Sequence, residues 1–192
     1  MRPEFALAVF VCMSLVCPTC LGQGRGSVNG DVFREASMGL TYEFPREFSP
    51  KVESEIHSRD STGREHMILA LWDTPERSGQ PRMAFLYDTK QRSSDRTHDT
   101  IALAYLGEIK GMWLSVKGVK MVGPTKVPEP SYDYWRLDLC APDQEPRYNS
   151  AIVITLSDRR VLVIKASAPS QSELDREVDS LARMRFDKNQ KE

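Results

Sequence analysis

Hydrophobic and polar positions form their clearest pattern in residues 150–168, SAIVITLSDRRVLVIKASA. Two runs of β-branched and aliphatic residues, 151–156 and 161–164, flank a polar break at 157–160. This arrangement predicts a β-hairpin, because Val and Ile pack well on a pleated surface. Both faces of the first run are at least partly apolar, so we expect central strands that other elements cover on each side.

Shorter runs predict the remaining strands. Apolar and polar residues alternate in 40–44, and Pro45 ends this run because proline cannot donate a hydrogen bond to a neighbouring strand. Pro124 interrupts another run, which we therefore place at an edge of the sheet. Residues 48–65 are polar without a clear period, and we interpret them as a loop. The predicted strands outside the hairpin are 32–35, 40–44, 66–73, 82–88, 119–127 and 132–140.

The run 132–140, YDYWRLDLC, carries an aromatic cluster of Tyr132, Tyr134 and Trp135. Tyr and Trp are enriched at interfaces, so the cluster could line a surface for a protein partner or a carbohydrate. The strict alternation of the run instead places Trp135 on an inner face with the leucines, and lets Tyr134 pack beneath a helix. The alternation favours a role in the core.

Two segments have helical periodicity. In 95–117 apolar residues recur at spacings of three or four, Ser94 or Asp95 is expected to cap the start, and Gly118 is expected to end the helix. Its predicted inner stripe consists of Ile101, Tyr105, Ile109, Met112, Val116 and Val119. Two glycines inside it, Gly107 and Gly111, cost about 1 kcal/mol each relative to Ala. We expect these glycines to form a groove that allows close packing against the sheet.

The second helix is predicted over 171–184. Residues 170–173, SQSE, form an S-x-x-E capping box at its start. Its predicted inner face consists of Leu174, Val178, Leu181 and Ala182. We expect this helix to cover one face of the hairpin and the 95–117 helix to cover the other. Lys165 and Ser167 are interpreted as the point where the second hairpin strand reaches the margin of the sheet.

The order of elements is strands, a helix, more strands and a final helix. A doubly wound fold would alternate strands and helices throughout, so this order predicts an α+β domain with a single, mostly antiparallel sheet. The apolar content of 40% and the charged content of 28% are ordinary for a globular protein. The net charge of -1, from 26 basic and 27 acidic residues without long runs of one sign, provides no electrostatic footprint for nucleic acid or an anionic membrane.

The N-terminal segment predicts export. Residues 5–17 form an uncharged apolar run that is too short to span a bilayer, and a helix breaker and small residues follow it. This is the order of a secretory signal peptide, although an uncleaved anchor is the alternative. The predicted organisation is a signal peptide at 1–22, a flexible lead-in at 23–31, a single domain at 32–187 and a charged tail at 188–192. After cleavage we expect no stable membrane anchor.

The predicted signal peptide determines which cysteines remain in the mature chain. Cys12, Cys17 and Cys20 lie in the leader, so the mature chain keeps only Cys140 and cannot form an internal disulfide. Neither Cys17 nor Cys20 follows a small residue of the kind that lipidation requires, which favours cleavage over a lipoprotein. Cys140 ends an apolar strand and is interpreted as a buried structural thiol, with a reactive thiol as the alternative.

No motif in the chain carries recognisable chemistry. The sequence lacks G-x-S-x-G, a P-loop and a strand-borne G-x-G-x-x-G, so we predict no catalytic, cofactor-binding or metal-binding residues. The histidines His57, His66 and His98 are not at metal-ligand spacings and are interpreted as solvated loop residues. The alternative is a small extracytoplasmic hydrolase or metal-dependent enzyme that uses His57, Glu65, His66 and His98.

Several local motifs resemble those of the PsbP/Mog1-like superfamily, and more closely those of small exported bacterial proteins that share its fold. They are GLTYEFP at 39–45, Tyr105-Leu106 in the long helix, YDYWRLDL at 132–139 and the closing run 148–186. The resemblance implies an α/β/α sandwich in which two main helices flank a central antiparallel sheet. Relatives are non-enzymatic binding or assembly factors, among them photosystem subunits of the thylakoid lumen and a nuclear transport regulator. We therefore expect an exported, non-enzymatic module, with no cofactor, that binds or stabilises a protein partner at the cell envelope.

Cleavage after Gly22 gives the first prediction. We expect the exported protein to begin at Gln23, because Cys20 and Gly22 are small enough for the positions before the cleavage site. Intact mass spectrometry of the protein recovered outside the cytoplasm checks this. A mass that retains residues 1–22, or that carries a lipid on a cysteine, would show that the prediction is wrong.

Overall fold

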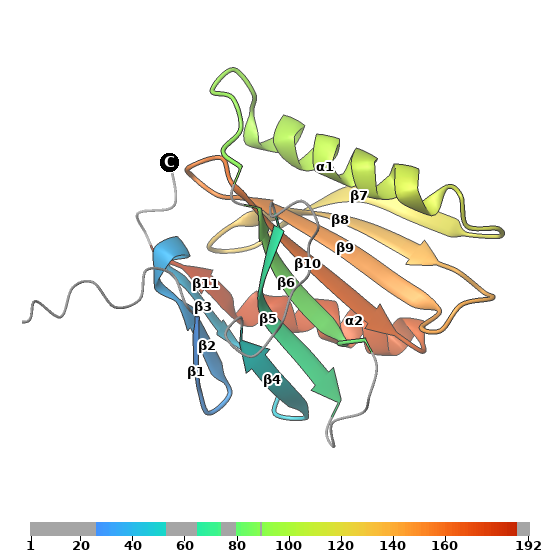
Figure 1. Cartoon of the computed structure of the whole chain (residues 1–192), viewed down its shortest axis with the longest axis horizontal. Coiled ribbons are helices and arrows are strands. Elements are labelled where there is room, and N and C mark those ends of the chain that lie inside the picture. The colour runs from blue at the N-terminus through green and yellow to red at the C-terminus, as the bar shows by residue number, and fades with distance from the viewer. Residues whose placement is uncertain (1–25, 53–64, 74–79, 89, 188–192) are drawn as a thin grey trace, which may run out of the picture.

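The computed structural model describes residues 26–52, 65–73, 80–88 and 90–187 (Figure 1). The described residues form two antiparallel sheets and two α-helices, with short 3₁₀ helices at Ala36–Met38 and Ser180–Arg183. In chain order the elements are β1 (Ser27–Asn29), β2 (Val32–Glu35), β3 (Leu40–Glu43), β4 (Phe48–Val52), β5 (Glu65–Asp73), β6 (Met83–Asp88), α1 (His98–Trp113), β7 (Lys120–Pro128), β8 (Asp133–Cys140), β9 (Tyr148–Thr155), β10 (Val161–Ala168), α2 (Gln171–Asp179) and β11 (Met184–Phe186).

The larger sheet has the strand order β4-β5-β6-β10-β9-β8-β7, and the smaller one has the order β1-β2-β3-β11. The hairpin β9–β10 is therefore at the centre of the larger sheet, as its apolar composition predicts. Val163 lies opposite Val153 and Ile164 opposite Ile152, so the register brings like residues together across the hairpin. Figure 1 shows α1 running along the β8–β9 side of this sheet.

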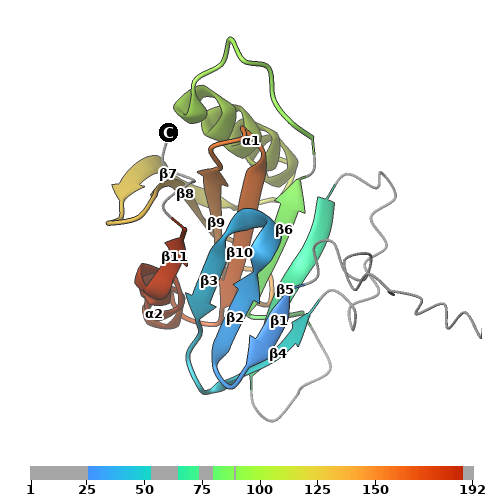
Figure 2. The same ribbon diagram turned by 90° about the vertical axis from the view of Figure 1, so that its left-hand side faces the viewer.

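Each face of the hairpin belongs to its own core. Ile152 and Ile154 pack in the larger core, together with residues of the smaller sheet and of α2. Ala151 and Val153 face the other way and pack against α1. In the turned view β1–β3 lie in front of β6 and β10, and α1 lies behind them (Figure 2). Both faces are thus covered, as expected for a hairpin that is apolar on both sides.

The α+β class with antiparallel strands and two main helices is confirmed, but the expectation of a single sheet is wrong. The second face of the larger sheet is covered by the four-stranded sheet as well as by α2. The last strand of that sheet, β11, pairs with β3 from the beginning of the chain. Such a pairing depends on contacts between distant segments, which local periodicity does not report.

Two boundaries differ from the predictions. Residues 48–52 form β4 and pair with β5, so the predicted loop at 48–65 is wrong there, while residues 53–64 lie outside the described residues. Within the predicted lead-in, Ser27–Asn29 form β1 and pair with β2. The edge position predicted from Pro124 is confirmed, because β7 is the last strand of the larger sheet.

Helix α1 is shorter than predicted. Thr97, and not Ser94 or Asp95, caps it by accepting a hydrogen bond from the backbone N–H of Thr100 at 3.2 Å. The helix ends at Trp113, and Gly118 lies beyond it in a turn with φ of 76°. Val116 and Val119 therefore lie outside the helix, and Met112 is 64% exposed instead of buried.

The predicted groove at Gly107 and Gly111 is also wrong. A Cβ added at either glycine would have no neighbouring atom within 4 Å, and both residues are exposed. They lie on the outer side of α1, away from Ile101, Tyr105 and Ile109, which are buried as predicted. A spacing of four residues fixes a common face on a helix, but it does not say which face the sheet covers.

Helix α2 begins as predicted, since the Ser170 side chain accepts from the backbone N–H of Glu173. Leu174, Val178 and Leu181 are buried, whereas Ala182 is exposed because the chain tightens into a 3₁₀ turn after α2.

The aromatic cluster belongs to the core, as the alternation favours. Tyr132 and Tyr134 are buried, and the Tyr132 hydroxyl donates to the Leu181 carbonyl at 2.7 Å. Trp135 is half-buried on the α1 side, where its indole N–H donates to the Asp99 carboxylate at 3.0 Å. The cluster therefore ties the sheet to the elements on both of its faces.

A charged cluster centred on Arg82 ties α2 to the beginning of β6. The Arg82 guanidinium pairs with Glu173 at 2.9 Å, with Asp73 at 3.2 Å and with Glu177. Glu177 is 1% exposed, and its Oε2 atom has no hydrogen-bond partner among the residues that the structure describes. Burial raises the pKa of Glu177 to about 7, although the Arg82 charge opposes this rise. The carboxylate is thus held in a place that disfavours its charge.

The first stability prediction concerns Ile154, which is 2% exposed in the larger core. Ile154→Asp buries an unpaired charge, and we expect it to lower the free energy of unfolding by about 4 kcal/mol or more. Circular dichroism and thermal unfolding measure the change. Val122→Asp is the matched control, because Val122 is 69% exposed on the edge strand β7 and its substitution should change stability by about 0.5 kcal/mol or less. Equal melting temperatures for Ile154→Asp and the wild type would contradict this core.

The second stability prediction concerns pH. The pKa of Glu177 is higher in the folded chain than its ordinary value of 4.5, so the stability that it contributes is present below about pH 4.5 and is lost as the pH rises through about 7. Glu177→Gln removes this titration. We expect the stability of the variant relative to wild type to rise by about 1–3 kcal/mol across that window.

Urea unfolding at several pH values measures the difference. Glu173→Gln is the control, because Glu173 pairs with the same Arg82 but is 39% exposed. The difference in unfolding free energy between Glu177→Gln and wild type should rise as the pH rises from about 4.5 to about 7. Parallel curves for Glu177→Gln and wild type would contradict the assignment.

Candidate functional site

Helix α1 covers only part of its face of the larger sheet. It packs on β8 and β9 and reaches Val161 and Val163 of β10, but the strip formed by β5 and β6 continues beyond it. Leu86 of β6 and Met67 of β5 face the α1 side and are only half-buried. Between this strip and the C-terminal end of α1 lies a pocket of about 310 Å³.

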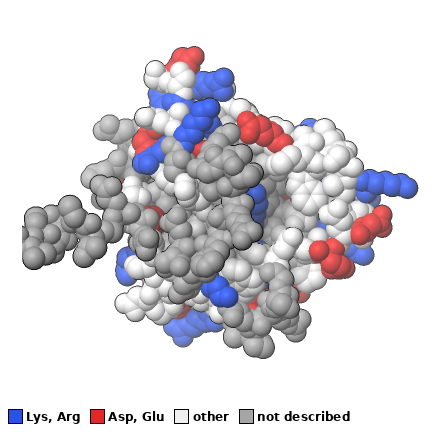
Figure 3. All heavy atoms as spheres, viewed as in Figure 1, with Lys and Arg blue, Asp and Glu red and all other residues white. Residues whose placement is uncertain are grey.

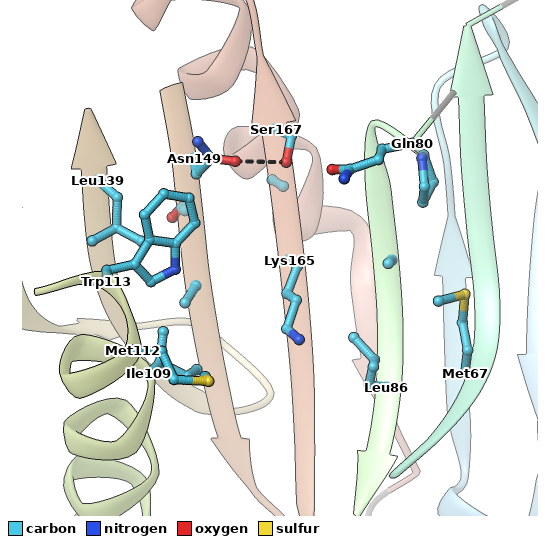
Figure 4. A pocket seen from close by; sticks show the side chains of 15 residues that line it. Met67, Gln80, Leu86, Ile109, Met112, Trp113, Leu139, Asn149, Lys165 and Ser167 are labelled. Carbon is cyan, nitrogen blue, oxygen red and sulfur yellow. Dashed lines mark hydrogen bonds between the residues drawn. The ribbon is translucent and has the colours of Figure 1, made fainter. Parts of the chain in front are cut away.

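The pocket has a sheet floor and two walls. Strands β6, β8, β9 and β10 supply the floor, α1 supplies one wall, and Met67 with Gln80 and Pro81 supplies the other (Figure 4). The lining is predominantly apolar. It consists of Met67, Gln80, Pro81, Ala84, Leu86, Ile109, Met112, Trp113, Leu139, Asn149, Ser150, Ala151, Lys165, Ala166 and Ser167.

Few polar side chains line the pocket, and one of them is charged. The Lys165 side chain lies between the α1 wall and Leu86 in the close view (Figure 4). It makes no ion pair or hydrogen bond with any described residue, and none of the lining side chains is a carboxylate. Ser167 donates a hydrogen bond to Asn149 at 2.9 Å, which satisfies these two groups at one end. The pocket therefore combines apolar walls with one ammonium that no described side chain pairs with.

The position of Lys165 corrects the interpretation made from the sequence. Lys165 and Ser167 do not mark the margin of the sheet, because β10 is the central strand and continues to Ala168. Their side chains are on the α1 face, where Lys165 lies opposite Ala84 and Ala151 in the neighbouring strands. A lysine is tolerated there because α1 does not cover this part of the strand. The break in the apolar pattern of β10 was the signal for the open strip.

The rim of the pocket is held from the opposite face of the sheet. Gln80 and Pro81 directly precede Arg82, whose guanidinium pairs with Glu173 and Glu177 on the α2 side. The Arg82 backbone N–H also donates to the Leu71 carbonyl at 2.8 Å. These contacts fix the segment that forms one wall.

Apolar surface continues outside the pocket. Met112 lines it and is 64% exposed, and Leu114, just past the end of α1, is 65% exposed. Scattered apolar side chains are ordinary on a protein surface, but Met112 is part of the lining of an apolar pocket and extends its apolar surface past the mouth. Leu114 is absent from the lining and follows Met112 by two helical positions, so the two side chains do not share a face of α1.

Charges elsewhere on the described surface are mixed. On the visible face basic and acidic side chains are interspersed, with a basic group near the loop before α1 (Figure 3). A hollow of about 330 Å³ there is lined by Lys90, Arg92 and Arg96. Arg92, however, pairs with Asp88 at 2.8 Å, and the Arg159 guanidinium donates to three carbonyls of the loop. Arg92 and Arg159 are therefore explained by the contacts that hold this loop.

The residues of the alternative enzyme hypothesis do not form a site among the described residues. His66 is in β5 and His98 is the first residue of α1, so neither is in a loop as interpreted from the sequence. Glu65 begins β5, and His57 lies outside the described residues. Residues 26–52, 65–73, 80–88 and 90–187 contain no group of three or more His, Cys, Asp or Glu that could hold a metal ion. Cys140 is a free, half-buried thiol, less enclosed than predicted.

Two predictions made from the sequence concern the terminal segments. The predicted signal peptide at 1–22 and the charged tail at 188–192 both lie outside the described residues. Among the helices that are described, none has the length and apolar character needed to cross a membrane.

Comparison with known proteins identifies a similar fold. No protein-family model matches the chain, and no curated protein matches it in sequence. The structure is similar to the solution structure of cyanobacterial PsbP (CyanoP) from Synechocystis sp. PCC 6803, with a TM-score of 0.53 and 12% sequence identity. The match covers 87% of this chain and 99% of that chain. The described domain therefore has a PsbP-like fold, and at this identity the likeness extends to the fold alone.

Proposed function

We propose that this chain is an exported, non-enzymatic binding module that holds a protein partner at the cell envelope. The observation that carries the proposal is the apolar pocket beside the C-terminal end of α1, with the exposed Met112 at its mouth. Export rests on the leader-like residues 1–22. Placement in the PsbP/Mog1-like superfamily, with its α/β/α sandwich, is part of the same proposal and is supported by the PsbP-like fold.

The pocket has the composition of a binding site. Ligand sites in proteins are mostly apolar clefts of about 300–1,000 Å³ with a few polar groups that orient what is bound. This pocket, at about 310 Å³, is at the small end of that range. The polar side chains on the α1 face of its described lining are the Lys165 ammonium, the Gln80 and Asn149 amides and the Ser167 hydroxyl. These groups can orient a bound molecule.

A protein suits the surface better than a molecule that only fills the pocket. Met112 extends the apolar area beyond the mouth, where a ligand of pocket size would leave it in water. A partner that covers Met112 gains about 25 cal/mol for each Å² of apolar surface removed from water. We therefore place the centre of the interface at the pocket and its outer part along the end of α1.

Site-specific photocross-linking tests this interface. Benzoylphenylalanine at position 112 is expected to capture a discrete partner from an envelope extract, because Met112 is at the mouth of the pocket. The same group at position 122 is the control, since Val122 is equally exposed but lies on the edge strand β7, away from the pocket. We expect a cross-linked product at 112 and none at 122.

A variant that fills the pocket completes the test. Ala84 is on the floor opposite Lys165, and Ala84→Phe places a ring in the cavity without removing a core contact. The product at position 112 should disappear in this background while the melting temperature stays near that of wild type. A product that forms equally at both positions, or that persists with Ala84→Phe, would refute the proposed interface.

A further inference from the structure

We propose that the pocket receives the C-terminal residue of the partner, with its apolar side chain between the walls and its terminal carboxylate at Lys165. This inference rests on the proposed function and specifies the chemistry of the group that is bound. It is carried by one juxtaposition: on the central strand, at the floor of an apolar pocket, stands an ammonium with no partner among the described residues, and no described lining residue is a carboxylate.

The charge of Lys165 defines the polar part of the ligand. Its nearest neighbours across the strands are Ala84 and Ala151, which offer no acceptor side chain. In the free protein water solvates the ammonium, because Lys165 is exposed. A partner that covers the pocket removes this water and must supply a compensating negative charge, since a buried unpaired charge is costly. A carboxylate does so with a short, charge-assisted hydrogen bond.

The side chains of the two pocket walls determine the apolar part of the ligand. Trp113 and Met112 on one side and Leu86 and Met67 on the other enclose a space that suits one large apolar side chain. The thioethers of the two methionines are flexible and polarizable, so the walls can adapt to different apolar shapes. The bound residue must therefore carry both an apolar side chain and a carboxylate within a few bonds of each other.

A chain end meets both conditions at once. In a C-terminal residue the carboxylate and the side chain share one Cα atom, and only one stretch of chain has to leave the pocket. An internal segment would have to enter and leave between the α1 wall and the wall formed by Gln80 and Pro81. The departing chain would pass Met112, whose exposure is then explained, and the Gln80 amide, which has no partner among the described residues, could bond to its backbone. A free carboxylic acid of pocket size would leave these groups uncovered.

Defined peptide pools test the proposal on the mature chain. Each pool carries an N-terminal fluorescein, a Gly-Ser spacer, three randomised positions and a fixed last residue, which is Leu, Ile, Met, Phe or Trp. Every pool is made with a free C-terminal carboxylate and again as the C-terminal amide. Fluorescence anisotropy measures binding up to about 1 mM protein, so that dissociation constants up to the millimolar range are detected. Decanoate is added as a competitor to represent the free acid.

We expect at least one carboxylate pool to bind, and its amide counterpart to bind about ten-fold more weakly or worse, because the amide lacks the charge that pairs with Lys165. Lys165→Met keeps the length and apolar stem of the side chain and should weaken the carboxylate pool by a similar factor while leaving the amide pool unchanged. Lys120→Met is the matched control. Lys120 is exposed on β7 and absent from the pocket lining, so this variant should bind like wild type.

Four results would overturn the inference: no pool binds, carboxylate and amide bind equally, Lys165→Met has no effect, or decanoate binds more tightly than every pool. The last result would assign the pocket to a free carboxylic acid. The photocross-link at position 112 separates these failures from failure of the proposed function. If the cross-linked product at position 112 forms while the carboxylate and amide pools bind with equal affinity, a protein partner binds here through some other group. If the product does not form, the proposed function fails as well.

Discussion

The structure depends on burying both faces of the hairpin β9–β10. Val161, Val163 and Ile164 of the second strand are at most 1% exposed, as are Ile152 and Val153 of the first. A strand that is apolar on both faces cannot leave either of them in water, so the chain has to provide two covers. One is α1. The other combines α2 with a small sheet whose strands come from opposite ends of the chain.

The two covers differ in width, and this difference creates the candidate site. A sheet of seven strands, with about 4.8 Å between neighbours, is close to 30 Å wide. A single helix with its side chains is about 10–12 Å in diameter, so α1 covers only two or three of these strands. The smaller sheet and α2 together cover more of the opposite face. The strip of β5 and β6 beside α1 is left partly open as a geometric consequence, and Lys165 marks where it begins.

The same geometry explains why a shared fold says little about function here. A match with a TM-score of 0.53 at 12% identity requires only that apolar positions recur where the sheet and its covers meet. The polar and exposed side chains of the pocket are not determined by these apolar contacts. The Lys165 ammonium, the Met112 thioether and the Gln80 amide are not needed to bury the hairpin, so nothing in the fold itself requires them. Function must be argued from these side chains.

Local patterns were sufficient for much of the fold. The hairpin, its two differently directed apolar faces, the alternation in β8 and the Ser170 cap of α2 all follow from spacing and residue type over a few residues, which is the range over which strand and helix geometry act. Spacing and residue type did not predict where α1 begins, because Thr97 and Ser94 are both good capping residues and only the packing of the helix selects one of them. The pairing of β3 with β11 joins segments about 140 residues apart and leaves no local trace.

The pocket could be recognised only from the tertiary structure. From the sequence, Lys165 was a polar break near the end of a strand, and Met112 was one more residue of an apolar stripe. Folding placed the lysine on the central strand and the methionine at the rim, since β10 continues past Lys165 and α1 turns Met112 away from the sheet. The sequence by itself determined which segments are apolar on which faces. Tertiary structure decided which of those faces remain uncovered, because that depends on the relative widths and positions of packed layers, which no single segment encodes.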